Sequence, residues 1–133
     1  MILIDTHVLV WLEHGSNRLG KQSLTIIDEA LHSRELAVSA VTFWEIAMLL
    51  EKKRLVSDVD PDRWRRDLLR IGMNEIPLRG DTAILAARLR QLHGDPADRI
   101  IMATAIGYSA TLITADKKIL DWKGQITVMD ASR

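Results

Sequence analysis

Four acidic residues stand beside apolar segments at widely separated places in this sequence. They are Asp5, Glu45, Asp98 and Asp116. Asp5 directly follows the apolar residues 1–4, and Asp116 follows the apolar run 111–114 after one intervening residue. A carboxylate taken out of water without a partner is costly. These acids therefore require either a structural partner or a chemical role.

Each acid has an ordinary structural explanation when it is taken singly. The two that follow apolar runs could cap the helices that come next. Glu45 fits a capping box with Thr42, in which the glutamate reaches back to the first residue of a helix. Asp98 falls in the first turn of a helix that Asp95 and a following proline begin, where the helix dipole favours an anion. Asp95 itself is better explained as a cap than as a metal ligand.

Taken together, the four acids predict a metal site. Each follows a predicted strand or begins a helix at the same end of the sheet, and the carboxyl ends of parallel strands share one edge. Four carboxylates gathered there cannot all ionise unless cations compensate their charge. Mg²⁺ and Mn²⁺ prefer such oxygen ligands. A divalent ion there would lower the pKa of a bound water and neutralise charge on phosphate oxygens, which suits phosphoryl chemistry.

The elements that would position these acids alternate between strands and helices. Short apolar runs rich in β-branched residues predict strands, and recurrence at helical spacing predicts helices. We expect strands at residues 1–4, 36–41, 74–78, 111–114 and 125–129, and helices at 6–13, 21–33, from Thr42, 61–71, 80–92, from Pro96, and 116–122. This order predicts an α/β fold of three layers, α/β/α, with a short central parallel sheet.

The helix predicted from Thr42 is apolar on nearly every side between Phe43 and Leu50. Such a helix is normally buried on more than one face. In a domain of this size, that indicates a surface for a second subunit or a partner. The next helix carries several arginines around Trp64.

The composition limits the class of protein. A chain of 133 residues predicts a single domain, residues 1–133. Eighteen basic and eighteen acidic residues give no net charge, which argues against a general nucleic-acid coat protein but not against an enzyme. The chain has no cysteine, so any metal must be held by oxygen or imidazole. No apolar run is long enough for a membrane span, and we expect a cytoplasmic protein.

At this point the motifs resemble a known family, the PIN-domain ribonucleases, and in particular the VapC-type toxins of type II toxin-antitoxin pairs. The matching segments run in the family's order over essentially the whole chain. They are Leu3-Ile4-Asp5-Thr6-His7, Ser39-Ala40-Val41-Thr42-Phe43-Trp44-Glu45-Ile46, Asp95-Pro96-Ala97-Asp98-Arg99 and Leu112-Ile113-Thr114-Ala115-Asp116. The family usually carries a larger aromatic residue where this chain has Ala97.

This resemblance implies an enzyme that cleaves RNA with a metal-activated water. By it, the acidic quartet Asp5, Glu45, Asp98 and Asp116 binds Mg²⁺ or Mn²⁺. Thr6 and Thr114 match hydroxyl residues that orient a carboxylate or a water. Arg99 is expected either to steer phosphate or to pair with an acid.

The resemblance also implies partners. They are an RNA substrate, a second copy of the chain in a homodimer, and a cognate antitoxin that blocks the site. We expect the antitoxin near the helix from Phe43 to Leu50 and near Trp64, although ordinary core packing also explains both segments. The basic residues Lys117 and Lys118 are candidate phosphate contacts beside the site.

Two other functions use similar features. A response-regulator-like domain also places acids at strand ends, but it requires a phosphoacceptor aspartate after the third strand, and residues 74–78 contain none. A PIN-like domain that only binds RNA or protein would lack cleavage. The complete quartet favours the enzyme over both.

Overall fold

The computed structural model describes residues 1–55, 58–92 and 94–133. Within these residues, strands and helices alternate in the predicted order. The elements are β1 (Ile2–Ile4), α1 (Thr6–His14), α2 (Lys21–His32), β2 (Leu36–Ser39), α3 (Ala40–Glu51), α4 (Pro61–Arg70), β3 (Asn74–Ile76), α5 (Gly80–Arg88), α6 (Pro96–Gly107), β4 (Thr111–Thr114), α7 (Lys117–Leu120) and β5 (Thr127–Asp130).

The strands form one parallel sheet in the order β3-β2-β1-β4-β5. The first strand therefore lies at the centre, between β2 and β4, and Leu3 and Ile4 are fully buried. A flavodoxin-like response regulator would place its third strand next to the first. The observed order rules out that alternative, and it brings the ends of β1, β2 and β4 side by side.

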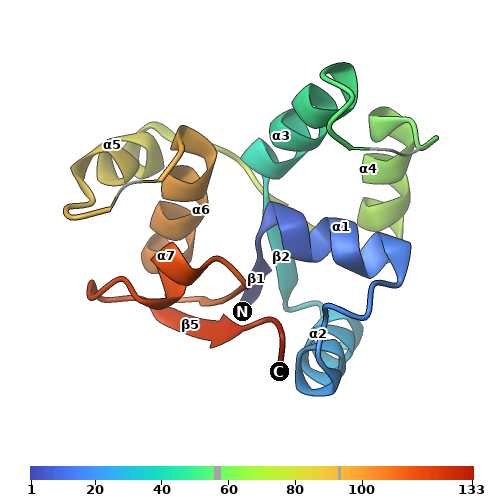
Figure 1. Ribbon diagram of the computed structural model, residues 1–133, viewed down its shortest axis with the longest axis horizontal. Helices are drawn as coiled ribbons and strands as arrows, with labels where there is room; N and C mark the ends of the chain where they lie inside the picture. Colours follow the sequence, from blue (N-terminus) through green and yellow to red (C-terminus); the bar gives the residue numbers. More distant parts are fainter. Residues whose placement is uncertain (56–57, 93) are drawn as a thin grey trace.

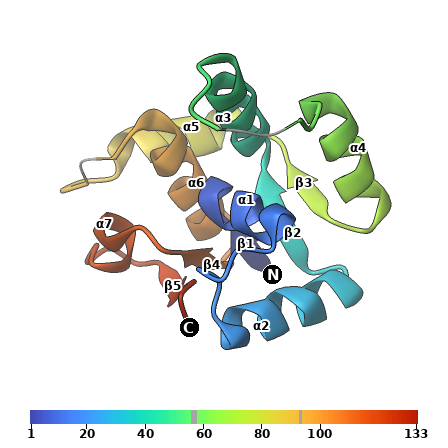
Figure 2. The same cartoon turned by 45° about the vertical axis from the view of Figure 1, so that its right-hand side comes forward.

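Helices cover both faces of this sheet, which confirms the predicted three-layer fold (Figures 1 and 2). One core packs Ile4 and Val38 against α1, α2 and α4. The other packs Leu3 and Leu112 against α5, α6 and α7. Adjacent residues of β1 thus face opposite layers, and burial on both faces explains why the central strands read as unbroken apolar runs.

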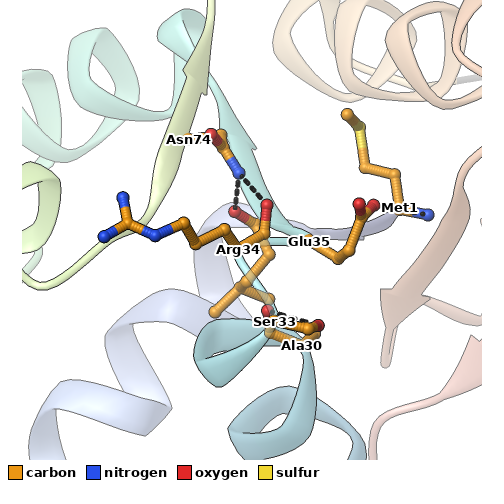
Figure 3. A network of polar contacts seen from close by, with 7 residues as sticks. Met1, Ala30, Ser33, Arg34, Glu35 and Asn74 are labelled. Atoms are coloured by element: carbon orange, nitrogen blue, oxygen red, sulfur yellow. Dashed lines mark hydrogen bonds and ion pairs between the residues drawn. The ribbon is translucent and has the colours of Figure 1, made fainter.

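Polar contacts fix the amino ends of the strands, at the edge opposite the acids (Figure 3). The Asn74 side chain donates to the carbonyls of Arg34 and Leu36, at 2.9 and 3.0 Å, which ties β3 to β2. The Met1 ammonium lies 3.4 Å from Glu35. These contacts hold the register of the strands whose other ends carry the site.

Several element boundaries differ from the prediction, including the bounds of β3, α7 and β5, and two of the differences bear on the site. Helix α3 begins at Ala40 because Ser39, not Thr42, is its N-cap and accepts from the amide of Val41 at 3.2 Å. The second strand is correspondingly shorter than predicted. At the other boundary, α5 ends at Arg88 and Leu89 is already extended, so the buried Leu89 and Leu92 pack from a loop.

Helix α3 is less buried than its sequence indicates. Only Thr42, Glu45 and Ile46 of α3 are fully covered, whereas Trp44 is 58% exposed. In the single chain, α3 contacts α1, α4 and α6, and the side that carries Trp44 remains exposed. Trp64 is instead a core residue with 6% exposure. Within residues 1–55, 58–92 and 94–133, no helix has the length and apolar character needed to cross a membrane.

Candidate metal centre

The two acids that follow neighbouring strands are joined by one hydroxyl. Asp5 follows β1, Asp116 follows β4, and these strands are paired. The Thr114 hydroxyl donates to Oδ2 of Asp5 and accepts from the amide of Asp116 at 3.1 Å. Thr114 is fully buried. The parallel pairing of β1 with β4 thus fixes both acids at the same edge of the sheet.

A second group of acids comes from the starts of two helices. Glu45 lies in the second turn of α3, while Asp95 caps α6 and Asp98 lies in its first turn. One carboxylate oxygen from each of these three residues lies within 4.8 Å of the others. Glu45 is only 7% exposed. The two helices therefore converge on one point.

The two groups meet in a cleft of about 260 Å³. Asp5, Asp95, Asp98 and Asp116 line it, together with His7 and Trp11. The structure thus gathers all four predicted acids at one site, because Glu45 lies beside Asp98 in the second group. The predicted convergence at the carboxyl edge of the sheet is confirmed as geometry.

Three of the aspartates cap helices while they face the cleft. Oδ1 of Asp5, Asp95 and Asp116 accepts from the amides of Val8, Asp98 and Lys118, at 2.9, 2.8 and 2.9 Å. A cap uses one carboxylate oxygen. The second oxygen of Asp5 accepts from Thr114, but each carboxylate oxygen has two lone pairs and can accept a further contact. Capping and a chemical role are therefore compatible at the same residue.

Glu45 has no such structural role. The predicted capping box is wrong, because α3 begins at Ala40 and Glu45 lies one turn beyond the helix start. Its Oε1 is buried without a hydrogen-bond partner among the described residues. A buried acceptor without a donor is costly, so this atom marks where an absent cation would be accommodated.

Burial and mutual repulsion favour the neutral forms of Asp5, Glu45 and Asp98. Burial, followed by the charges of Asp95 and Glu45, raises the pKa of Asp98 to about 7. Burial also raises the pKa of Asp5, although the Thr114 hydroxyl opposes this. Burial raises the pKa of Glu45 as well, against a hydrogen bond from Thr6. A nearby divalent cation would reverse these shifts by favouring the charged forms.

The residues present therefore suit a hard divalent cation. Every candidate donor is a carboxylate oxygen, which is the ligand type preferred by Mg²⁺ and Mn²⁺. The buried Glu45 oxygen without a partner adds an independent indication.

Comparison with known proteins identifies the family. The profile of the PIN domain matches residues 2–124. The chain belongs to the PIN-domain family. It is 32% identical over 119 residues to ribonuclease VapC22 of Mycobacterium tuberculosis, covering 89% of this chain and 88% of that protein. The resemblance noted from the motifs is therefore confirmed.

Solved structures share the fold of this PIN domain. A toxin-antitoxin complex from Klebsiella pneumoniae contains a chain 26% identical to it, with a TM-score of 0.65 and 98% of each chain covered. VapBC2 from Rickettsia felis, bound to a DNA fragment from its promoter, gives a TM-score of 0.70 at 16% identity, over 97% of this chain and 98% of that one. At such low identity, the second likeness shows the fold alone.

The hydroxyl and basic residues beside the acids differ in their roles. The hydroxyls of Thr6 and Thr42 are hydrogen-bonded to each other at 3.1 Å, and both threonines are buried. The guanidinium of Arg99 is held by backbone carbonyls and not by an acid among the described residues. It donates to backbone carbonyls of Ala86, Ala87, Leu89 and Leu92, at 3.0, 3.3, 2.6 and 2.8 Å. Arg99 therefore joins α6 to the end of α5.

Asp95 is the site residue that sequence reasoning missed. It was predicted to cap α6, which it does, but its carboxylate also lies with Glu45 and Asp98 in the second group. The signal was the close spacing of two acids in the segment Asp95-Pro96-Ala97-Asp98. Positions three apart lie on one face of the first helical turn, so a cap and a first-turn acid could have been expected to share a ligand.

Proposed function

We propose that this PIN domain is a divalent-metal-dependent endoribonuclease and the toxin of a toxin-antitoxin pair. The observation that carries the proposal is the convergence of five acids at one edge of the sheet, among them the buried Glu45, whose Oε1 has no hydrogen-bond partner among the described residues. Two comparisons support it, since the curated relative is named a ribonuclease and the Klebsiella pneumoniae structure is described as a toxin-antitoxin complex. A cytoplasmic location would give such an enzyme access to its RNA.

The proposed metal ligands are Asp5, Glu45, Asp98 and Asp116, with Asp95 beside them. Mg²⁺ or Mn²⁺ bound there would lower the pKa of a water and offset charge on the phosphate. The chain's part is to hold the carboxylates in place. Thr114 orients Asp5, and the three helix caps fix the aspartate side chains before any cation or RNA arrives.

Cleavage of RNA by the purified protein tests the activity. The wild-type protein should cut a generic RNA in Mg²⁺ or Mn²⁺ and should be inactive in EDTA. Asp5→Asn should lower the rate by more than about 100-fold. The folded structure should persist, because an asparagine oxygen can still accept from the Val8 amide as a helix cap. On expression in cells, only the wild type should arrest growth.

Asp60→Asn is the matched control. Asp60 also caps a helix, α4, and accepts from the Asp62 amide, but it does not line the acidic cleft. Its variant should cleave RNA like the wild type. Full activity of Asp5→Asn, or full activity in EDTA, would overturn the proposal. Binding of RNA without cleavage would instead identify a non-catalytic PIN domain.

The proposed partners are a cognate antitoxin and a second copy of the chain. The exposed part of α3 between Phe43 and Leu50 is the proposed contact for the antitoxin, with Trp64 supporting it from the core. Trp44 is the largest exposed apolar side chain of this helix. An apolar surface of this kind commonly marks a protein contact.

A further inference from the structure

A second cavity lies beside the acidic cleft and carries basic and aromatic side chains. Its volume is about 410 Å³, and its lining is formed by Gln91, Leu92, Lys118, Asp121, Trp122 and Lys123. No residue of this lining belongs to the set of proposed metal ligands. We call this cavity the Trp122 pocket.

The residues of the Trp122 pocket neighbour, along the chain, two of the three segments that line the cleft, while the third segment, from Asp5 to Trp11, lines the cleft alone. Leu92 precedes Asp95 on one segment, and Lys118 follows Asp116 on the other. A hydrogen bond connects the linings of the two cavities, because the amide of Lys118 in the pocket donates to Asp116 in the cleft. The Leu92 carbonyl accepts from Arg99, one residue beyond Asp98. An RNA strand that leaves the cleft between these two segments would enter the Trp122 pocket.

The indole ring is held in a fixed position. Its Nε1 donates to the Arg90 carbonyl at 2.9 Å. The backbone of Gly124 passes so close to the ring that an added Cβ would lie 2.0–2.3 Å from three ring atoms. Aromatic side chains held in this way offer a surface on which nucleic-acid bases stack, without a preference for one base.

The two neighbouring lysines of α7 lie on different sides. Lys118 lines the Trp122 pocket. Lys117 lines another cavity with Asp130 and Arg133. Hydrogen bonds from Ser132 lower the pKa of Asp130 most, and the charge of Lys117 lowers it further. From the sequence, both lysines are candidate phosphate contacts. In the structure, only Lys118 lines the Trp122 pocket.

We propose that the Trp122 pocket is a subsite for single-stranded RNA next to the acidic cleft. A base stacks on Trp122, and Lys118 and Lys123 contact the phosphates, while the single acid Asp121 leaves the lining with a net positive charge. The substrate class rests on the function proposed above. The subsite gives the neutral chain a local positive patch next to the acids, where an RNA strand must be held.

Binding measured in EDTA separates this proposal from cleavage. A fluorescein-labelled single-stranded RNA of twelve mixed nucleotides would be titrated by anisotropy at several salt concentrations. Loss of one phosphate contact reduces the slope of log K against log salt by about 0.7 for a single strand. Lys118→Ala should show this reduction. Lys117→Ala, the matched control on the adjacent residue, should bind like the wild type.

Loss of stacking has a different signature. Trp122→Leu should weaken binding by about 5- to 150-fold with no change in the salt slope. Trp122→Phe retains an aromatic ring and should bind more tightly than the leucine variant. Since Trp122 also packs on the core, thermal melting of each variant shows which are folded, and Lys118→Ala at the surface tests the subsite independently of the core.

The outcomes distinguish the two proposals. If the wild type cleaves RNA and neither Lys118→Ala nor Trp122→Leu alters binding, the subsite is overturned and the nuclease stands. If both variants bind as expected and no condition gives cleavage, the subsite stands and the nuclease is overturned. If the wild type binds no RNA, both are overturned. Equal losses in Lys117→Ala and Lys118→Ala would also overturn the subsite.

Discussion

Asp5 shows how a single side chain can serve the fold and the site. Its Oδ1 accepts from the Val8 amide and begins α1, while its Oδ2 accepts from Thr114 on the neighbouring strand. The carboxylate is thus held from two elements, and it is only 5% exposed. Capping and catalysis are competing explanations in the sequence, but in the structure the capping residue also lines the cleft, so the two are compatible.

Glu45 provides a prediction about stability and metal binding together. Glu45→Gln removes a buried charge that has an oxygen without a partner. We expect the free energy of unfolding of the metal-free protein at pH 8 to rise by about 1 to 3 kcal/mol. The increase in melting temperature on adding Mn²⁺ should become smaller. Thermal unfolding in EDTA and in Mn²⁺ measures both effects.

Glu51→Gln is the control for that experiment, since Glu51 ends the same helix and is exposed. It should change neither quantity. A Glu45→Gln protein that is less stable in EDTA and responds fully to Mn²⁺ would show that Glu45 has a structural role instead.

Asp98 provides a prediction about pH. Its pKa is about 7 in the folded chain against 3.8 when unperturbed, so between these values the folded state holds more protons than the unfolded state. The free energy of unfolding contributed by Asp98 is therefore lost as pH rises from about 4 to 7. Each unit of pKa shift corresponds to about 1.4 kcal/mol. The loss should be on the order of 1 to 4 kcal/mol.

Comparison with Asp98→Asn isolates the contribution of Asp98 and its coupling to the neighbouring acids, because acids far from the site titrate equally in both proteins. In EDTA, the wild type should lose stability relative to the variant between pH 4 and 7, and the difference should be constant above pH 8. A difference independent of pH would contradict the raised pKa. The measurement is urea unfolding at a series of pH values.

At the scale of elements, Arg99 forms a joint between α5 and α6, and this joint positions the two acids at the start of α6, Asp95 and Asp98. Arg99 donates to four carbonyls at the end of α5 and in the following loop. A lysine keeps the charge but cannot reproduce this planar set of donors. Arg99→Lys should therefore weaken Mn²⁺ binding in the absence of RNA by about 10- to 100-fold, as measured by calorimetry.

Arg88→Lys is the matched control, because Arg88 lies at the end of α5 and is exposed. It should bind Mn²⁺ like the wild type. If Arg99→Lys also binds Mn²⁺ normally, the joint does not control the acids. If it loses only RNA affinity, Arg99 contacts phosphate after all.

These element-scale features mark the limit of prediction from the sequence. Strands and helices were predictable because burial on both faces gives unbroken apolar runs and because Asp-Pro pairs begin helices. The end of β2 was misplaced because Ser39 and Thr42 are both good caps, and only packing selects between them. The role of Arg99 was not predictable because its partners are backbone carbonyls. Every residue has a carbonyl, so the sequence does not indicate which of them an arginine will contact.

At the scale of the whole molecule, the apolar exposure of α3 is the main feature that a single chain leaves unexplained. Trp44 is 58% exposed on a helix with a buried opposite side. If this surface binds the antitoxin, Trp44→Lys should weaken copurification with the cognate antitoxin by more than about tenfold. Cleavage of RNA should be unchanged, since Trp44 does not line the cleft.

Leu24→Lys is a suitable control, because Leu24 is an exposed apolar residue on α2. Equal antitoxin binding by the Trp44→Lys protein would exclude this helix as the contact. Sedimentation of the wild type alone tests the homodimer separately, with an expected mass of twice 15.0 kDa.

The pairing of β1 with β4 also determines when the acidic site can be complete during synthesis. Asp5 leaves the ribosome early, but the hydroxyl that orients it belongs to Thr114, 109 residues later. A nascent chain that ends before β4 lacks Thr114 and Asp116 and has no neighbour on one side of its central strand. The nuclease proposed here would therefore be harmless to the messenger being translated until nearly the whole chain has been made.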